Sequence, residues 1–578
     1  MWKTLATVRK YLWRYRWGMA VGLACLTVKD VAQASQLLMI RSAVNALAKP
    51  QGLLFLRYAA FLVMLALIQG IFQYWMRVIL IGISRDIEFD LRNDIFRRLV
   101  GLSPDYFQRT RTGDIMARCT NDLNAVRMML GPGIMYCVET SLAFVLAFAI
   151  MVSDDWRLTL FAILPAPLVS LAVIFFGRMI HARFERIQAM FSDISSRVQE
   201  NLAGVRMVRA FAQERAELRR FEELNRQYIA QNLKLVRIQG IFQPLLEALI
   251  GFTFLLVLLV GGYQMLEGRI TLGSYIMFNT SMGRLVWPMI ALGWVVNLMQ
   301  RGTASLARIN QMMEERPTIA APADPHPLLA VEGTIEFRRV SMEYGGLPAL
   351  QDLDLSIPSG ATIAVVGHTG SGKTTLVSLI PRLMDPTEGE VLVDGVSLRN
   401  FDPQELRRHI GFVPQETFLF SGTIAENIAF GVEDASEAEV RRAAELAGLS
   451  TDIAAFPDGY ATVVGERGIT LSGGQKQRTA IARAILRDPR ILILDDALSS
   501  VDTLTEERIL TQLAEVMRGR TVILISHRVS TVRQADRIIV LSHGSIVEQG
   551  THAELIEAGG YYAELSQRQM LEEELEAI

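Results

Sequence analysis

The most informative segment of the chain is TIAVVGHTGSGKTTLVSLIPRL (362–383). Its first residues predict a short buried strand, and its apolar second half predicts a helix. Between the two, GHTGSGKT (367–374) satisfies the pattern G-x-x-x-x-G-K-[ST] in full, in the strand–loop–helix context that makes this pattern specific. Glycines allow backbone amides to turn toward phosphate groups, and the helix N-terminus adds a favourable partial charge. The segment therefore predicts a phosphate-binding loop.

Two side chains of this loop carry specific chemistry. Lys373 is expected to reach the β- and γ-phosphates of a nucleotide, and Thr374 is expected to ligate Mg²⁺. The residues that we predict to bind the nucleotide here are Gly367, His368, Thr369, Gly370, Ser371, Gly372, Lys373, Thr374 and Thr375.

A second apolar segment, ILILDD (491–496), predicts another buried strand that ends in two carboxylates. Asp495 is placed to hold Mg²⁺, directly or through water, and Asp496 is placed to orient the water that attacks the phosphate. Taken alone, the two acids could simply cap the next helix. Next to a phosphate-binding loop, the catalytic interpretation is favoured.

The composition bounds the class of protein. The chain has 578 residues, of which 51% are hydrophobic and 20% are charged, and its formal net charge is −2. A mean hydropathy of +0.27 is too high for a disordered chain and unusual for a soluble one. The near-neutral charge excludes a bulk basic field for nucleic acid, and three cysteines exclude a disulfide scaffold.

The hydrophobic residues are concentrated before residue 300, where long apolar runs occur. A helix that crosses a bilayer needs about 20 mostly apolar residues. Six segments meet this requirement approximately: 18–40, 54–83, 131–152, 157–178, 243–266 and 273–299. The first is interrupted by Lys29 and Asp30, and the sixth by Arg284 and Pro288, so these two are the least regular.

Basic residues predict the orientation of these spans. They are concentrated before the first span, between the second and third spans, and between the fourth and fifth spans. These regions are therefore expected to be cytoplasmic, together with the N-terminus and everything after the sixth span. Helical spacing of apolar residues in 183–237 indicates that the two long connections are helices continuing from the membrane. Ordinary cytoplasmic loops are the alternative. Turns are expected near 107–114 and 204–214.

Polar and ionisable residues within the spans are candidates for functional roles, because exposure to lipid would be costly. They either pair with one another, as Lys29 could with a neighbouring carboxylate, or line a cavity. Trp287 and the methionines beside it could line a pocket for apolar ligands or simply pack between helices. The polar candidates are Lys29, Asp30, Gln33, Gln73, Arg77, Glu139, Glu247, Asn279 and Arg284.

Four prolines between residues 314 and 332 predict an extended connector. We therefore expect a transmembrane domain over 1–313, a linker over 314–332 and a nucleotide-binding domain over 333–578.

LSGGQ (471–475), with the phosphate loop before it and LILDD after it, resembles the ATP-binding cassette family closely. VGERG (464–468) and SSVD (499–502) resemble that family's flanking segments. By resemblance, Tyr344 would stack on adenine, Gln415 in VPQE would approach Mg²⁺, and His527 in LISHR would lie at the γ-phosphate. Six spans before one cassette look like a half-transporter of the exporter type.

The resemblance implies a membrane α-helical bundle with long cytoplasmic extensions, followed by an α/β P-loop NTPase cassette with a helical subdomain. It implies an ATP-hydrolysing translocase in the bacterial inner membrane, dependent on ATP and Mg²⁺, that moves drugs, lipids or peptides and binds no nucleic acid. Such cassettes act as head-to-tail pairs, so a second half-transporter is required. The residues expected to reach the partner's ATP are Ser472, Gly473, Gly474 and Gln475.

One residue departs from the family pattern. The residue after the magnesium aspartate is usually Glu, and here it is Asp496. Its side chain is shorter by one methylene, and misplacement of about 1 Å can cost on the order of 10²-fold in rate. We expect this chain's own site to bind ATP but to hydrolyse it poorly, while its intact LSGGQ completes the competent site of a different subunit. The alternatives are a homodimer that tolerates Asp, an ATP-holding regulatory subunit, or a soluble cassette ATPase of DNA repair, which the six spans oppose.

Overall fold

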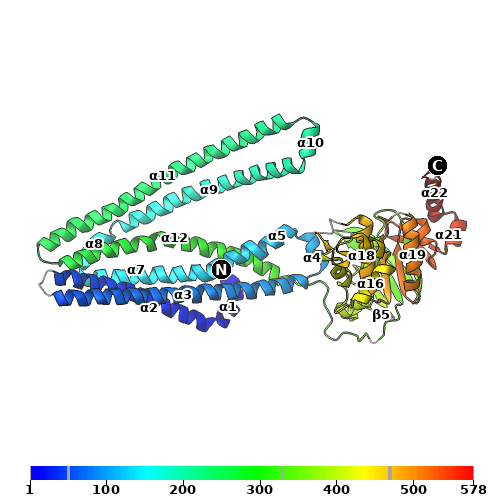
Figure 1. The fold of residues 1–578 in the computed structure, drawn as a ribbon, viewed down its shortest axis with the longest axis horizontal. Coiled ribbons are helices and arrows are strands. Elements are labelled where there is room, and N and C mark those ends of the chain that lie inside the picture. The colour runs from blue at the N-terminus through cyan, green and yellow to red at the C-terminus, as the bar shows by residue number, and fades with distance from the viewer. Residues whose placement is uncertain (1, 48–51, 329, 466–470, 502, 577–578) are drawn as a thin grey trace. The chain divides into compact units, whose positions relative to one another are not determined.

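The computed structural model describes residues 2–47, 52–328, 330–465, 471–501 and 503–576. The chain divides into two compact units (Figure 1). The first comprises Met1–Val100 and Thr112–Glu315, and the second comprises Gly101–Arg111 and Arg316–Ile578.

The first unit is entirely helical in its described residues. Four long helices dominate it: α3, α9, α11 and α12. The α-helices are α1 (Trp2–Arg14), α2 (Arg16–Leu47), α3 (Gly52–Val100), α5 (Thr112–Ala117), α6 (Leu123–Met128), α7 (Ile134–Asp154), α8 (Trp156–Ile163), α9 (Ala166–Ala203), α10 (Val205–Ala210), α11 (Glu214–Leu266) and α12 (Leu272–Glu314). Two π-helical turns, η1 (Arg118–Asp122) and η2 (Met129–Gly133), join α5, α6 and α7 into one continuous rod.

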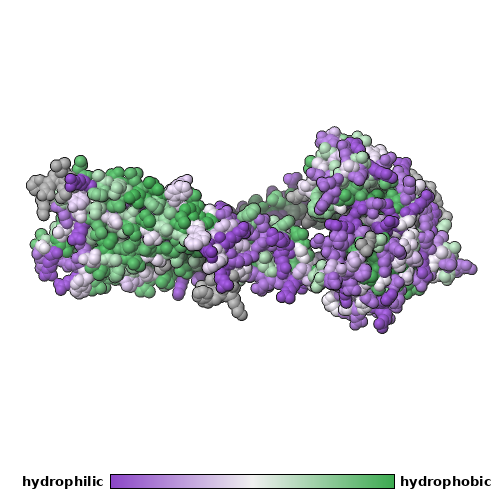
Figure 2. Space-filling model, turned by 90° about the horizontal axis from the view of Figure 1, so that it is seen from below, coloured by the Kyte–Doolittle hydropathy of each residue, from purple (hydrophilic) through white to green (hydrophobic). Residues whose placement is uncertain are grey.

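Six helical segments among the described residues are long and apolar enough to cross a membrane. They are Arg16–Leu47, Phe55–Val100, Thr112–Asp154, Trp156–Ala203, Glu214–Leu266 and Leu272–Glu314. The predicted number of spans is therefore confirmed. Side chains such as Phe61, Leu67 and Ile71 on α3 are exposed, and Figure 2 shows hydrophobic residues gathered on the surface of this unit. A surface of this kind is suited to lipid.

The long basic connections are helical, as the apolar spacing predicts. Helix α3 continues to Val100, and α9 and α11 lie side by side with the short helix α10 at their tip (Figure 1). The chain turns at Gly204 and again after Ala210, within the predicted segment 204–214. Cytoplasmic loops without regular structure are therefore the wrong interpretation of these connections.

The second unit contains two main sheets. One has six strands in the order β12-β11-β3-β10-β9-β6, parallel except for β12, and the other has four in the order β2-β1-β4-β5. A short third sheet pairs β7 with β8. The strands are β1 (Ile335–Tyr344), β2 (Leu347–Ile357), β3 (Thr362–Val366), β4 (Glu388–Val393), β5 (Val396–Ser397), β6 (Ile410–Val413), β7 (Gly422–Thr423), β8 (Val463–Val464), β9 (Ile491–Asp495), β10 (Thr521–Ile525), β11 (Arg537–Ser542) and β12 (Ser545–Gly550).

Helices surround these sheets and supply two large apolar clusters of the cassette core. One cluster joins the helical subdomain, α15 to α18, to β9 and β10, and the other fills the space between the two main sheets. The helices of this unit are α4 (Pro104–Arg109), α13 (Lys373–Leu379), α14 (Pro403–Arg408), α15 (Ile424–Ala429), α16 (Glu437–Leu446), α17 (Ser450–Ala455), α18 (Gly473–Leu486), α19 (Thr503–Met517), α20 (Val529–Val532), α21 (His552–Ala558) and α22 (Tyr561–Glu576), with 3₁₀ turns η3 (Leu398–Asn400) and η4 (Gly459–Ala461).

One segment of the expected transmembrane domain groups with the second unit of the structure. The predicted transmembrane domain, 1–313, includes Gly101–Arg111, but this segment groups with the cassette. Tyr106 of α4 is buried, and the hydroxyl oxygen of Ser103 accepts a hydrogen bond from the backbone amide of Ile319 at 3.1 Å. This hydrogen bond joins two residues that are 216 positions apart in the sequence.

Candidate nucleotide site

The phosphate loop leaves the end of β3 and enters α13, as predicted. Its shape requires glycine at two positions. Gly367 (φ +153°) and Gly372 (φ +100°) have positive φ, and a Cβ at these positions would lie 2.2 Å from the carbonyl oxygen of Leu541 and 2.4 Å from that of Ala349. Any side chain there would displace the backbone of neighbouring segments. Glycine at both positions therefore allows the loop to keep the conformation in which its amides face the phosphate site.

Lys373 begins α13 and is buried. Its Nζ donates hydrogen bonds to the carbonyl oxygens of Gly367 at 2.8 Å and His368 at 2.9 Å. Burial lowers the pKa of Lys373, although Asp495 and Asp496 partly oppose the shift. The ammonium is therefore held over its own loop, at the position where the motif requires a phosphate partner.

Asp495 ends β9 and is buried beside Thr374. Burial raises the pKa of Asp495, and Asp496 adds to the shift, while the hydrogen bond from Thr374 opposes it. Among the described residues, Oδ2 of Asp495 has no hydrogen-bond partner. A hydroxyl and an unpartnered carboxylate oxygen fit Mg²⁺, which prefers oxygen ligands and takes the rest from water and phosphates. No cluster of three or more His, Cys, Asp or Glu with metal-site geometry occurs in the described part of the chain.

Asp496 has an unusual backbone conformation, with φ at +50°. Its amide donates to the carbonyl oxygen of Ile525 at 3.0 Å, and its own carbonyl accepts from the hydroxyl of Ser499 at 3.0 Å. Asp is one of the few residues enriched in this region of backbone space. Because the backbone is held on both sides, the length of the side chain determines how far its carboxylate reaches.

A cavity of about 310 Å³ brings most of the predicted site residues together at the carboxyl ends of the parallel strands. The predicted residues that line it are Tyr344, Thr369, Gly370, Gly372, Lys373, Thr374, Thr375, Gln415, Asp495, Asp496 and His527. Gly367, His368 and Ser371 belong to the same loop but do not line the cavity. Partial burial, followed by the positive charge of Lys373, lowers the pKa of His527.

The signature residues Ser472 to Gln475 do not line this cavity. They begin α18 with reciprocal hydrogen bonds: the hydroxyl oxygen of Ser472 accepts from the Gln475 amide, and the Gln475 side-chain oxygen accepts from the Ser472 amide. Ser472 and Gly473 are exposed. In the flanking segments, 466–468 of VGERG and 502 of SSVD lie outside the described residues.

Several contacts at the site were not predicted. Ala349 and Ile525 also line the cavity, and Ile525 could have been found because it ends a strand within the LISHR motif itself. The C-terminal helix α22 also approaches the loops. The ring of Tyr561 lies 4.7 Å from that of His368, and the amide of Gln569 donates to the carbonyl oxygen of His527. No local sequence signal marks these two contacts.

Within the membrane unit, Lys29 forms ion pairs with Asp30 at 2.8 Å and Glu139 at 2.5 Å. Lys29 therefore pairs with neighbouring carboxylates and also lines a cavity, so the two alternatives hold together at this residue. Arg284 instead donates to the carbonyl oxygen of Gln33 at 2.6 Å and to the side chain of Gln36 at 3.0 Å.

Comparison with known proteins agrees with this geometry. Residues 19–289 match the family described as ABC transporter transmembrane region, and residues 350–499 match the family described as ABC transporter. The chain is 39% identical over 524 residues to a probable multidrug resistance ABC transporter ATP-binding/permease protein, YheI, of Bacillus subtilis (strain 168), covering 90% of this chain and 89% of that protein.

It is also 34% identical over 557 residues to an ATP-dependent lipid A-core flippase of Syntrophus aciditrophicus (strain SB), covering 96% and 93% of the two chains. Among solved structures, a bacterial Atm1-family ABC exporter with ATP bound matches with a TM-score of 0.80 and 27% identity, covering 96% of this chain and 98% of that one. The chain therefore belongs to the ABC transporter family, as a half-transporter in which a six-span membrane domain is fused to one ATP-binding cassette.

Proposed function

We propose that this half-transporter is one subunit of an ATP-driven exporter that moves hydrophobic or amphipathic solutes out of the cytoplasm or inner leaflet. The observation that carries the proposal is the meeting of Lys373, Thr374 and Asp495 in one cavity, in a chain with six spans. Relatives named as a multidrug resistance transporter and as a lipid A-core flippase make drugs and lipids the first candidate solutes, and the family resemblance adds peptides.

ATP binding would exchange the contacts of Lys373 with two loop carbonyls for charge-assisted hydrogen bonds to the β- and γ-phosphates. Thr374, Asp495 and Gln415 would hold Mg²⁺, which neutralises charge on the phosphates. Tyr344, which lines the cavity and is exposed, would stack on the adenine. His527 would face the γ-phosphate, and its lowered pKa keeps the imidazole neutral at pH 7 before the nucleotide arrives.

We propose further that the site built on this chain's own phosphate loop hydrolyses ATP poorly. Asp496 is held by its backbone, so its shorter side chain cannot be compensated by moving the strand end. The residues Ser472 to Gln475 lie outside this cavity with Ser472 exposed, as is suitable for completing the site of another subunit. A Ser hydroxyl and Gly amides at a helix N-terminus suit a γ-phosphate.

Asp496 in the chain's own site, combined with an intact LSGGQ segment, resembles the degenerate-site TmrB subunit of the TmrA–TmrB multidrug exporter. We therefore propose a heterodimer with a second, different half-transporter. A homodimer that tolerates Asp496 is the second candidate, because the family includes both arrangements by resemblance. A subunit that holds ATP without any hydrolysis of its own is the third. The same resemblance implies a bacterial inner membrane, with the N-terminus and the cassette in the cytoplasm.

One experiment tests the exporter and separates the two dimers. Inside-out vesicles from the native membrane are assayed for ATP-dependent accumulation of a lipophilic fluorescent dye, with the wild-type chain, Ser472→Arg and Asp496→Asn. In a heterodimer, Ser472→Arg abolishes accumulation because it blocks the competent site, while Asp496→Asn reduces it little. In a homodimer both variants abolish it. No ATP-dependent accumulation of any solute tested with the wild-type chain, despite ATP binding, would refute the exporter.

The same vesicles can be solubilised and the tagged chain purified. Recovery of a second half-transporter in equal amount supports the heterodimer, and recovery of untagged copies of this chain contradicts it. The proposed division of the chain, 1–313, 314–332 and 333–578, can be tested by limited proteolysis, which should cut first in the proline-rich linker.

A further inference from the structure

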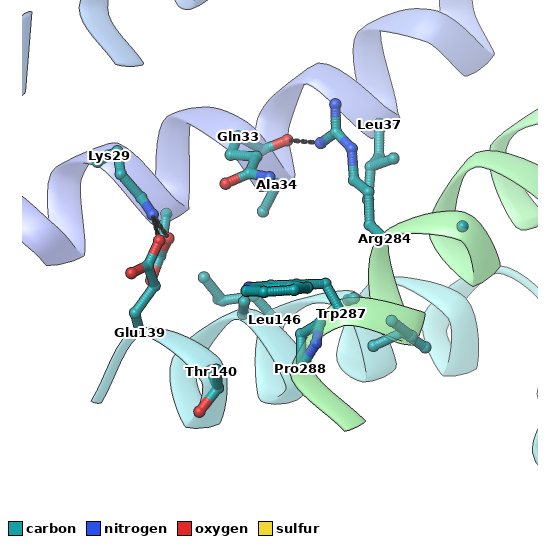
Figure 3. A pocket seen from close by; sticks show the side chains of 15 residues that line it. Lys29, Gln33, Ala34, Leu37, Glu139, Thr140, Leu146, Arg284, Trp287 and Pro288 are labelled. Atoms are coloured by element: carbon teal, nitrogen blue, oxygen red, sulfur yellow. Dashed lines mark hydrogen bonds and ion pairs between the residues drawn. The ribbon is translucent and has the colours of Figure 1, made fainter. Parts of the chain in front are cut away.

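A polar cavity lies among three of the helices that are long and apolar enough to cross a membrane. It has a volume of about 230 Å³ and is lined by residues of α2, α7 and α12. Figure 3 shows Lys29 and Glu139 at one side of the cavity, Arg284 at another, and the ring of Trp287, seen edge-on, between them. Charged side chains at this depth are costly and usually mark a functional site.

The end of the cavity at Lys29 carries an excess of negative charge. Lys29 is paired with two carboxylates, Asp30 and Glu139, so these three groups sum to one negative charge. Lys29 and Asp30 are almost completely buried, whereas about a quarter of the Glu139 side chain is exposed, at 25%. Glu139 is therefore the member of the group that a ligand can reach, and an ammonium is the ligand that it favours.

The other end carries an uncompensated positive charge. Arg284 contacts two neutral acceptors, the carbonyl oxygen of Gln33 and the side chain of Gln36. No carboxylate among the described residues lies within ion-pair distance of it. A guanidinium has five N–H donors in a planar fork that matches a carboxylate or phosphate. A ligand anion would supply the partner that the chain itself does not.

The distance between the two ends follows from α2, which contributes to both. Lys29 and Asp30 precede Gln33 and Gln36 by three to seven residues. At 1.5 Å per residue, the ends are about 5–10 Å apart along the helix. A ligand can span this distance if its ammonium and its anionic group are separated by a few bonds, with the ammonium donating a hydrogen bond at one end and the anion accepting one at the other. The exposed ring of Trp287, with Leu146 and Pro288, offers an apolar surface for the remainder of the ligand.

We propose that this cavity binds a zwitterionic amphiphile, with its ammonium at Glu139, its phosphate or carboxylate at Arg284, and its apolar portion against Trp287. The inference rests on the proposed exporter function and narrows its substrate class. A zwitterionic lipid headgroup and a small soluble zwitterion share this chemistry. The apolar surface of Trp287 favours the ligand with attached acyl chains.

The test uses the full chain, purified in detergent without nucleotide, and measures binding of dihexanoyl phosphatidylethanolamine by calorimetry. Three further probes isolate each feature. Dihexanoyl phosphatidylglycerol carries only the anion, dihexanoyl trimethylammonium-propane carries only the cation, and O-phosphoethanolamine lacks the acyl chains. We expect the zwitterionic lipid to bind about tenfold or more tightly than each of the three, because each lacks one group that the cavity matches.

Variants then assign the charges to residues. Arg284→Gln should weaken the zwitterion about tenfold while leaving the cation-only lipid unchanged, and Glu139→Gln should weaken the zwitterion while leaving the anion-only lipid unchanged. Arg269→Gln and Glu267→Gln are matched controls, since these two residues pair with each other outside the cavity, and should have no effect. A general packing defect would weaken all lipids equally.

Equal binding of the three lipids to the unmodified chain would overturn the proposal, even if a variant fails to fold. Uniform weakening by Arg284→Gln, in a variant that keeps the melting temperature of the unmodified chain, would overturn it as well. Equal affinity for O-phosphoethanolamine and dihexanoyl phosphatidylethanolamine would show that the acyl chains add nothing, and would refute a lipid as the ligand. The binding measurement uses no ATP, so a chain that exports dye but shows no headgroup preference refutes this inference alone. A chain that prefers the zwitterion but transports nothing refutes the exporter alone.

Discussion

Replacing Asp496 by Glu should increase ATP hydrolysis at the site built on this chain's phosphate loop. The backbone of residue 496 is fixed by hydrogen bonds to Ile525 and Ser499, so the added methylene extends the carboxylate by about 1.5 Å toward the cavity. Because an error of about 1 Å in a catalytic group can cost on the order of 10²-fold, we expect the rate to increase about 10- to 100-fold. This range corresponds to about 1.4–2.7 kcal/mol of transition-state stabilisation.

The substitution also has a cost that can be measured separately. Residue 496 has φ at +50°, a conformation that Asp adopts more readily than Glu. The longer residue should therefore destabilise the cassette by about 1 kcal/mol, visible as a decrease of a few degrees in the melting temperature. A gain in turnover together with a loss of stability would show that Asp at residue 496 favours the stability of the cassette, whereas Glu favours hydrolysis.

The assay is phosphate release by the purified chain at saturating Mg-ATP, with single-turnover measurements to separate chemistry from product release. Asp496→Asn serves as the isosteric control and should remove the residual activity, because it keeps the length but not the basicity of the side chain. Robust turnover by the wild-type chain, with no gain in the Glu variant, would refute the reasoning that side-chain length limits this site.

Three further predictions concern the same cassette. Asp495→Asn should raise the melting temperature of the nucleotide-free protein, since the raised pKa of Asp495 means that its charge opposes folding at neutral pH, and it should remove the stabilisation by Mg-ATP. An unchanged response to Mg-ATP in a thermal-shift assay would contradict the metal role. The lowered pKa of His527 keeps its imidazole neutral in the folded protein at pH 7, so its contribution to stability is present above pH 6.5 and is lost as the pH falls through the lower folded pKa. The melting temperature of the wild-type chain should therefore decline slightly more steeply with acidification than that of His527→Gln, and parallel pH profiles would contradict this. Gln569→Ala removes two hydrogen bonds to the loop around His527, so hydrogen exchange at the amide of Val529 should accelerate, whereas the exposed neighbour variant Gln567→Ala should leave it unchanged.

Features that depend on local pattern were predictable from the sequence. The apolar runs predicted six spans because a bilayer imposes a minimum length on each helix. The phosphate loop, Asp495 and Asp496 were predictable because each follows a short buried strand, and parallel strands end at one edge of a sheet. The shared cavity is the consequence of this rule.

Features that depend on contacts between distant residues were not predictable. Nothing in the segment 101–111 indicates that Ser103 bonds to Ile319, and nothing near Gln569 indicates that it bonds to the loop of His527. The π-helical turns η1 and η2 were also missed, because Arg118–Gly133 has no periodicity that distinguishes them from an α-helix. Pairing of Lys29 was predictable in kind, but the identity of Glu139 as its second partner required the structure.

The grouping of Gly101–Arg111 with the cassette changes how the two units are joined covalently. The backbone passes from one unit to the other after Val100, again after Arg111, and a third time after Glu315. The proline-rich connector is therefore one of three covalent links between the units. The other two are the backbone bonds at the two ends of the short segment Gly101–Arg111. Cleavage of the connector would leave the two units joined by the backbone at both ends of this insert, and a cassette expressed from residue 333 onward would lack a segment that belongs to its own unit.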